Sequence, residues 1–244
     1  MTVRGGWGAP ARTMQFGPGI PVPLAVARLI AANTGLYLLQ LLTGSWLIVN
    51  FGLVPALVGE GELWRLFTYQ FLHGGLVHLG LNMFMLWMFG SELERRWGSS
   101  FFVKYYFVCS VGGGILFTLV RWGTWIPSIG ASGGIYGILM AYALWFPDRR
   151  VFVWFLFPIK VRYLVIFLIA LEALQAIEST GTGVAHAAHL GGMGFGYAYL
   201  RWYGVGAGRL VPPRVRVEEL RRSWRRWRLR RLQRRRMGRG PTLH

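Results

Sequence analysis

The sequence predicts an all-α, polytopic membrane protein in which six transmembrane helices pack as one bundle. Of the 244 residues, 54% are hydrophobic and only 15% are charged, whereas soluble domains contain about 25% charged residues. Mainly apolar runs recur along the chain, most of them close to the roughly 20 residues that a helix needs to cross a bilayer. This composition excludes a disordered chain and argues against a soluble globular protein.

The order of apolar and charged segments predicts three regions. Residues 1–24 are a short, Gly- and Pro-rich leader, and because the pattern of a cleaved signal peptide is missing, the first apolar run is expected to be an uncleaved signal-anchor. Residues 25–203 are the six-span domain, and residues 204–244 are an Arg-rich tail. The predicted spans are residues 25–49, 76–93, 101–120, 131–146, 161–178 and 186–203.

The connection Asn50–Gly75 is too polar to span the bilayer and too apolar to be a free loop. It contains Trp64 and Arg65, and tryptophan is frequent at membrane interfaces. We therefore expect a partly immersed, interfacial or re-entrant segment here, and short connections elsewhere.

Lysine and arginine fall almost entirely on one side of this topology. With six spans both termini share a side, which carries 25 of the 27 basic residues and leaves only Arg65 and Arg121 opposite. Cytoplasmic loops are enriched in Lys and Arg. We therefore expect both termini in the cytoplasm and a multi-pass protein of the cell (plasma or inner) membrane.

The tail combines apolar residues at helical spacing with arginine at most positions between them. The apolar positions are Val217, Leu220, Trp224 and Trp227. A basic amphipathic helix of this kind is typical of segments that lie on anionic lipid headgroups. The alternative is a solvated tail that only fixes the topology. Because the positive charge is concentrated in the tail, we expect no nucleic-acid partner.

Polar residues within the spans are the candidate functional residues, because they are costly in a bilayer. The fourth span begins with Gly130-Ala131-Ser132-Gly133-Gly134. A Gly-x-Ser-x-Gly pattern also marks the nucleophile elbow of α/β-hydrolases, but that motif needs a preceding strand in a soluble fold. Because no such strand is expected here, two roles remain for Ser132. It is either an N-cap of the helix, or a functional hydroxyl that lies beside the free N–H groups at the helix start.

His189 lies near the start of the sixth span, which runs in the same direction as the fourth. The patterns Gly133-x-x-x-Gly137 and Gly192-x-x-x-Gly196 allow these two helices to approach closely. Packing alone would explain the glycines, but it would also bring Ser132 within reach of His189. A histidine that is hydrogen-bonded to a serine acts as its general base.

His78 and Asn82 are four residues apart in the second span and therefore share a helix face at the same outer depth. Two neutral donors directed at one point suit a developing oxyanion, and the alternative is a hydrogen-bonded pair between helices. We expect His73, five residues earlier, to support this region.

The sequence places no carboxylate where it would complete a catalytic triad. Glu172 in the fifth span either faces the bundle or snorkels, and no motif links it to His189. We therefore expect a Ser132–His189 dyad. The histidine spacings do not match a zinc site, and the single cysteine, Cys109, excludes an intramolecular disulfide. We expect no metal.

Together these motifs resemble the rhomboid intramembrane serine proteases of the bacterial six-helix type, over about residues 25–203 and in the same order. The matching segments are Trp64-Arg65 with Phe67-Thr68, His73-x-x-x-x-His78-x-x-x-Asn82, Glu94-Arg95-Arg96-Trp97-Gly98, Gly130-Ala131-Ser132-Gly133 with Tyr136, and Ala188-His189-x-x-Gly192-x-x-x-Gly196.

The resemblance implies a rhomboid-like bundle with Ser132 as nucleophile and His189 as general base. It implies an oxyanion hole formed by His78, Asn82 and the Ser132 backbone N–H, and it implies that Tyr136 packs on the catalytic histidine. The residues implied to support the site are Gly130, Gly133, His73, Trp64 and Arg65. It also implies no cofactor and lateral substrate entry by movement of the region Tyr163–Val184. Neither a soluble N-terminal domain nor a seventh helix is expected.

The leading hypothesis is a serine endopeptidase that cleaves transmembrane segments of single-pass or polytopic membrane proteins near the outer face of the bilayer. The alternative is a non-proteolytic rhomboid-like scaffold that binds client transmembrane helices. Such relatives usually lack the serine or the histidine, and this chain has both. A transporter is a weaker hypothesis, because the sequence gives little sign of a polar path through the spans.

Overall fold

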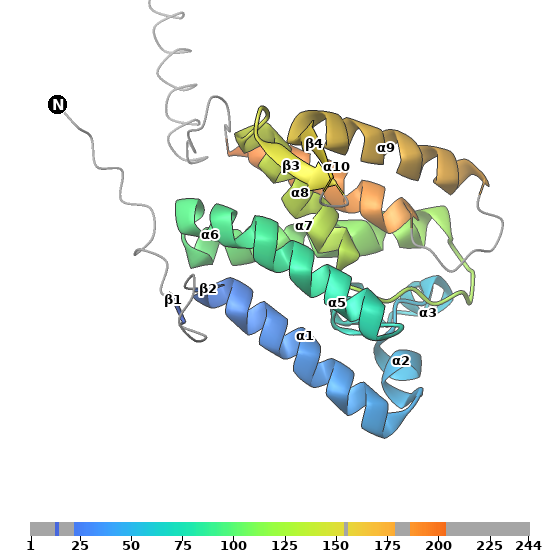
Figure 1. Cartoon of the computed structure of the whole chain (residues 1–244). Coiled ribbons are helices and arrows are strands. Elements are labelled where there is room, and N and C mark those ends of the chain that lie inside the picture. The colour runs from blue at the N-terminus through green and yellow to red at the C-terminus, as the bar shows by residue number, and fades with distance from the viewer. Residues whose placement is uncertain (1–12, 15–21, 154–155, 179–185, 204–244) are drawn as a thin grey trace, which may run out of the picture. The chain divides into compact units, whose positions relative to one another are not determined.

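The structure is a computed structural model that describes residues 13–14, 22–153, 156–178 and 186–203 (Figure 1). A helix lies within each of the six predicted ranges. Most of the predicted leader and all of the predicted tail, with its amphipathic segment, lie outside the described residues.

The first helix is shorter than its predicted range. β1 (Thr13–Met14) pairs antiparallel with β2 (Val22–Pro23), and α1 (Leu24–Thr43) follows directly. Gly44 ends α1 with a φ of +60°, a conformation that favours glycine. The end of the predicted range is a separate helix, α2 (Trp46–Phe51). Hydropathy misses this break because both segments are apolar.

The start of α1 is held by a carboxylate from a distant part of the chain. The Ala25 and Val26 N–H groups donate to Glu94 over 2.9 and 2.8 Å, and Ser99 Oγ donates to it over 2.5 Å. The first N–H groups of a helix lack intrahelical partners and attract negative charge. Glu94 therefore joins α1 to α6 (Ser91–Trp97).

The connection between the first two predicted spans is a folded segment. It contains α3 (Pro55–Gly59), α4 (Arg65–Thr68) and the 3-10 helix η1 (Tyr69–Phe71). Arg65 is buried, and its Nη1 donates to the carbonyl oxygens of Val49 and Gly52 over 2.9 and 2.7 Å. Its Nε also donates to Glu62 over 2.5 Å. The Arg65 guanidinium thus links α4 by hydrogen bonds to Val49, Gly52 and Glu62.

The second helical segment extends beyond its predicted end. α5 (Leu76–Met85), the π-helical η2 (Leu86–Gly90) and α6 continue to Trp97. Gly98, with a φ of +79°, separates them from α7 (Ser99–Val120). The later helices are α8 (Ser132–Trp145), α9 (Val161–Glu178) and α10 (His186–Trp202), and they agree with their predicted ranges to within one residue at each end.

An antiparallel hairpin lies between α8 and α9 (Figure 1). β3 (Arg150–Val153) pairs with β4 (Phe157–Lys160), with Val151 opposite Ile159. The expectation from the sequence is a short connection here without strands. The segment is rich in valine, isoleucine and phenylalanine, which favour strands.

Three helical segments among the described residues are long and apolar enough to cross a membrane: Leu24–Thr43, Leu76–Trp97 and Ser99–Val120. α8 and α10 contain 14 and 17 residues, and the 18 residues of α9 include Arg162, Glu172 and Glu178. The structure therefore agrees with a helical membrane bundle, and the count of six transmembrane helices stays a prediction.

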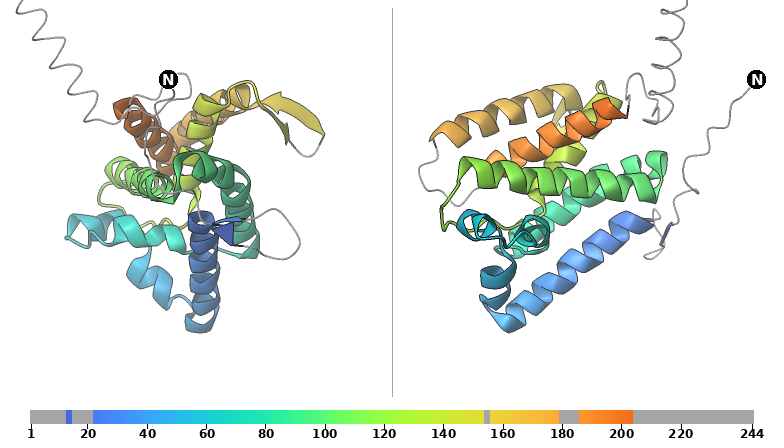
Figure 2. Two further views of the ribbon diagram at one scale, coloured as in Figure 1. Left: turned by 90° about the vertical axis from the view of Figure 1, so that its left-hand side faces the viewer. Right: turned by 180° about the vertical axis from the view of Figure 1, so that it is seen from behind.

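Within this bundle α8 is a central helix, which packs along α7 and contacts α5 and α9 (Figure 2). α10 approaches α8 so closely that a Cβ atom at Gly192 would overlap the carbonyl oxygen of Gly133. A Cβ atom at Gly137 would lie 3.1 Å from the carbonyl oxygen of Gly192. The close contact predicted from the glycine patterns is therefore present.

Candidate active site

Ser132 lies at the start of α8, after a loop that is tied to the folded connection. Leu53 and Ser128 exchange backbone hydrogen bonds of 3.0 and 2.8 Å, and the Gly130 N–H donates to the Tyr69 carbonyl over 3.0 Å. Gly130 has a φ of +127°, which residues with a side chain rarely adopt. These restraints set where the chain enters α8, and so where the Ser132 hydroxyl lies.

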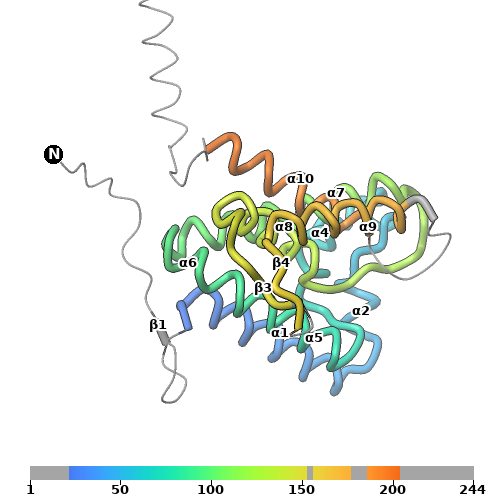
Figure 3. Tube along the Cα trace, turned by 45° about the horizontal axis from the view of Figure 1, so that its top comes forward, coloured from blue at the N-terminus to red at the C-terminus, as the bar shows by residue number. Residues whose placement is uncertain are grey.

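The Ser132 hydroxyl and the His189 ring are in hydrogen-bonding contact. Ser132 Oγ lies 2.8 Å from His189 Nε2, although the two residues are 57 positions apart in the chain. The distance falls within the range of about 2.6–3.2 Å that a general base needs. α8 and α10, which carry these residues, lie side by side (Figure 3). The contact follows from the close glycine packing of the two helices.

The His189 ring is also held on its other sides. Tyr136, one turn after Ser132 on α8, stacks on it with a centroid distance of 4.1 Å and an interplanar angle of 5°. Glu172 Oε1 on α9 lies 3.0 Å from His189 Nδ1, the nitrogen that faces away from the serine. Despite this short distance, Nδ1 makes no hydrogen bond among the described residues.

The expectation that no carboxylate stands close to His189 is therefore wrong. Glu172 is buried and faces the bundle instead of snorkelling. Its Oε1 accepts from the Tyr136 hydroxyl over 2.5 Å, and its Oε2 lies 2.7 Å from His186 Nδ1. Sequence reasoning missed the pairing because a single glutamate in an apolar helix does not reveal its rotation. A usable signal was present in the glutamate itself, since ionisable residues in spans usually face a polar partner.

Glu172, His186 and His189 are also the described residues whose geometry could hold a metal ion. Each offers one ligand atom, and these atoms lie within 4.8 Å of one another. The Glu172 carboxylate already contacts both histidine rings, through Oε2 to His186 Nδ1 and through Oε1 to His189 Nδ1. The cluster is therefore explained by its internal polar contacts.

His78, on the first turns of α5, borders the serine. A Cβ atom at Gly130 would lie 2.9 Å from His78 Nε2 and 3.9 Å from Ser132 Oγ, so both side chains flank this glycine. The Gly74 N–H donates to His78 Nδ1 over 3.3 Å. A neutral His78 with an accepting Nδ1 carries its proton on Nε2. This tautomer directs an N–H donor toward the region of Ser132.

Asn82 follows His78 by one turn and is buried. Within the described part of the chain its Nδ2 group has no hydrogen-bond partner. An unpaired buried donor costs about 1–3 kcal/mol. A buried donor that is free of partners and follows His78 by one helical turn is suited to binding an anion that forms only during a reaction.

The sequence of this chain matches a known protein family. The sequence profile of the Rhomboid domain matches residues 60–205, which is more than half of the chain. The chain belongs to the rhomboid family. The match includes Ser132, His189, His78, Asn82 and Glu172, so all the side chains described above lie inside the rhomboid domain.

Several curated rhomboid proteins are similar to this chain. The mitochondrial RHOMBOID-like protein 12 of Arabidopsis thaliana is 26% identical over 75% of the chain. Rhomboid protease GluP of Bacillus subtilis is 34% identical over 62% of it, and the mitochondrial Rhomboid protein 1 of Saccharomyces cerevisiae is 34% identical over 54%. The aligned regions cover 59%, 28% and 39% of these relatives, so the chain spans only part of their length.

The other predicted residues of this rhomboid domain divide between the site and the folded connection. Gly133 packs against α10, and His73 is fully buried with its ring 5.1 Å from that of His78. Trp64 is exposed, and its Nε1 donates to the Asn50 carbonyl over 3.3 Å. Trp64 and Arg65 therefore organise the folded connection and do not contact the serine–histidine pair.

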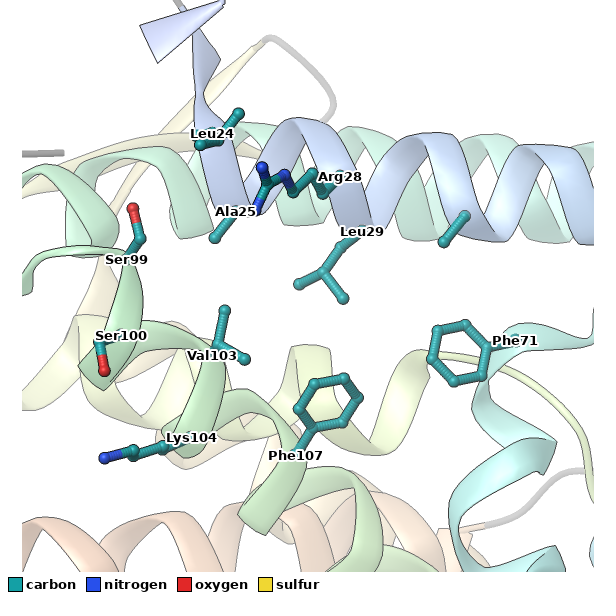
Figure 4. A pocket seen from close by; sticks show the side chains of 11 residues that line it. Leu24, Ala25, Arg28, Leu29, Phe71, Ser99, Ser100, Val103, Lys104 and Phe107 are labelled. Atoms are coloured by element: carbon teal, nitrogen blue, oxygen red, sulfur yellow. The ribbon is translucent and has the colours of Figure 1, made fainter. Parts of the chain in front are cut away.

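A separate groove of about 540 Å³ lies between α1 and α7. Apolar side chains such as Leu29 and Val103 line it, together with the cationic Arg28 and Lys104 (Figure 4). None of the site residues lines this groove. The candidate active site is therefore the polar cluster around Ser132.

Proposed function

We propose that this rhomboid is an intramembrane serine endopeptidase in which Ser132 and His189 cleave a peptide bond of a membrane-protein substrate. The observation that carries the proposal is the 2.8 Å contact between Ser132 Oγ and His189 Nε2 at the start of two closely packed helices. The name of the Bacillus subtilis relative, a rhomboid protease, supports the same activity.

In the first half of the reaction, Ser132 Oγ bonds to the substrate carbonyl carbon while its proton moves to His189 Nε2. The carbonyl oxygen becomes an oxyanion, which the Nε2–H of His78, the amide of Asn82 and the Ser132 backbone N–H stabilise. The carbon–nitrogen bond then breaks, and His189 gives its proton to the leaving amine.

In the second half, a water molecule replaces the amine. His189 removes a proton from this water, and the resulting hydroxide attacks the acyl carbon. The bond to Ser132 Oγ then breaks, and His189 returns the proton to this oxygen. The products are the free carboxylic acid and the regenerated serine. The net reaction adds one water molecule across the peptide bond, and the proposed steps use only groups of this chain and water.

We propose transmembrane segments of single-pass or polytopic membrane proteins as substrates, cut near the outer face of the bilayer. A helical peptide bond is hydrogen-bonded and shielded, so small or helix-breaking residues next to the cut favour cleavage. The excess of basic residues on one side supports cytoplasmic termini and a cell-membrane location. The Arg-rich tail is proposed to contact anionic lipid headgroups.

The test is cleavage of a fluorogenic transmembrane substrate, together with labelling by a fluorophosphonate probe, for purified wild type, Ser132→Ala and His189→Ala. We expect both variants to lose at least about 1,000-fold in cleavage rate, and probe labelling to require Ser132. Ser91→Ala removes a different buried hydroxyl, on α6, and is the matched control that should keep full activity.

Cleavage by purified Ser132→Ala protein at the wild-type rate would contradict the proposal. A folded wild-type protein that neither cleaves nor reacts with the probe, but retains transmembrane peptides, would instead support the non-proteolytic scaffold. A melting curve for each variant shows whether a loss of cleavage comes from a missing catalytic group or from an unfolded protein.

A further inference from the structure

The buried carboxylate of Glu172 joins three helices at the candidate site. Its Oε1 accepts a hydrogen bond of 2.5 Å from Tyr136 of α8 and lies 3.0 Å from His189 Nδ1 of α10. Its Oε2 lies 2.7 Å from His186 Nδ1. From this geometry we infer that Glu172 is a positioning residue, which completes a Ser132–His189–Glu172 relay; the inference rests on the proposed proteolytic function.

The need for this residue follows from the two nitrogens of His189. Nε2 faces Ser132 and must be free of a proton to act as base, so in the resting site the ring proton belongs on Nδ1. Glu172 Oε1 is the carboxylate oxygen placed 3.0 Å from that nitrogen. An acceptor at this position selects the productive tautomer and stabilises the imidazolium that forms when Ser132 reacts.

The orientation of Glu172 is itself determined by its neighbours. Tyr136 stacks flat on the His189 ring and donates to Oε1, so the same side chain fixes the plane of the ring and the position of the oxygen. His186, one turn before His189 on α10, holds Oε2. Nδ1 and Oε1 lie 3.0 Å apart without forming a hydrogen bond, and catalytic hydrogen bonds often become shorter and straighter once substrate is bound.

The competing explanation is that Glu172 has only a structural role and stabilises the packing of α9 against its neighbours. A buried carboxylate is costly inside a helical bundle, and contacts with Tyr136 and His186 would stabilise it without any effect on the chemistry. The two roles differ in what they change. If Glu172 has only a structural role, its substitution changes folding and substrate entry. If Glu172 positions His189, its substitution changes the reactivity of the Ser132 hydroxyl.

The experiment compares wild type, Glu172→Gln, Glu172→Leu and Glu172→Asp as purified full-length proteins. It measures kcat and KM for a transmembrane substrate and the second-order rate at which a small fluorophosphonate labels Ser132. The probe is small and soluble, so its rate does not depend on entry of a substrate helix. Val165→Ala, which shortens another buried side chain of α9, is the control for loosened packing.

We expect Glu172→Leu to lower both kcat and the labelling rate by about 100-fold or more, with KM within about threefold of wild type. Glu172→Gln keeps the shape but removes the charge and should lose at least about tenfold. Glu172→Asp should recover most of the lost rate. Val165→Ala should lower the melting temperature and leave the labelling rate unchanged.

Labelling of Glu172→Gln and Glu172→Leu at the wild-type rate would overturn the inference and leave the proposed function standing. If the wild-type protein neither reacts with the probe at Ser132 nor cleaves the substrate, the proposed proteolytic function is contradicted, and the inference about Glu172 is overturned with it. If Glu172→Leu does not fold, the Glu172→Gln protein decides, and an unchanged labelling rate there overturns the inference.

Discussion

His73 illustrates how burial sets the charge of a single side chain next to the candidate site. The residue is fully buried, and its backbone is held by Gln40, whose side chain donates to the His73 carbonyl over 2.6 Å. Loss of water around the ring, and then the neighbouring His78, lower the pKa of His73 to about 4. His73 therefore stays neutral at physiological pH and supports His78 as an uncharged neighbour.

This shift predicts sensitivity to acid. Between pH 6.5 and 4, the unfolded chain binds a proton at His73 that the folded protein does not, so stability is lost as the pH falls through this window. From pH 7 to 5 the expected loss is about 2 kcal/mol. In detergent micelles, His73→Leu should show a smaller acid-induced fall in melting temperature than wild type. Equal falls in both proteins would show that His73 is not the responsible group.

At the scale of elements, the approach of α10 to α8 brings His189 to Ser132. Gly192 packs against the carbonyl of Gly133, the residue directly after Ser132, and Gly196 packs against Tyr105 and Cys109 of α7. Helices in a bilayer gain little from the hydrophobic effect on packing, so close backbone contact through small residues is a main source of association. The glycines therefore control the distance between Ser132 and His189.

Two neighbouring glycines of α10 give a matched test of this packing. A Cβ atom at Gly192 would overlap the Gly133 carbonyl, whereas one at Gly194 would meet nothing within 4 Å. We expect Gly192→Ala to lose about 1–3 kcal/mol of stability and most of its cleavage rate. Gly194→Ala should be neutral or more stable by up to about 1 kcal/mol. Melting curves and cleavage assays check both, and similar behaviour of the two variants would contradict this account.

For the described bundle as a whole, the side of the membrane on which each loop lies follows from charge. α8 separates the loop before Ser132 from the hairpin β3–β4, whose segment carries Arg149, Arg150, Lys160 and Arg162. From the excess of basic residues we propose that the hairpin lies in the cytoplasm and the Ser132 end of α8 at the outer face.

The single cysteine makes this orientation testable. Cys109 is buried and is the one cysteine of the sequence, so the substitution Cys109→Ser gives a background without thiols. In intact bacterial cells, a membrane-impermeant maleimide should label Trp125→Cys, an exposed position before α8, and should reach Arg150→Cys only after permeabilisation. The opposite pattern would reverse the proposed topology.

The sequence alone predicts the helical architecture and most of the candidate site. Long apolar runs, glycine patterns and the four-residue spacing of His78 and Asn82 are local features. They can therefore be recognised in the sequence without any knowledge of how the helices pack. The breaks at Gly44 and Gly98 and the β3–β4 hairpin were harder to predict, because they interrupt or join segments of similar apolar composition.

The sequence by itself determined which residues could react: a serine at a helix start, a histidine in a parallel span and two donors on a third helix. Only the tertiary structure decided that Glu172 belongs with them. Hydropathy records that a carboxylate is present in an apolar helix, but the rotation of α9 depends on packing against α8 and α10. That rotation brings Oε1 to within 3.0 Å of His189 Nδ1, and no local pattern in the sequence encodes it.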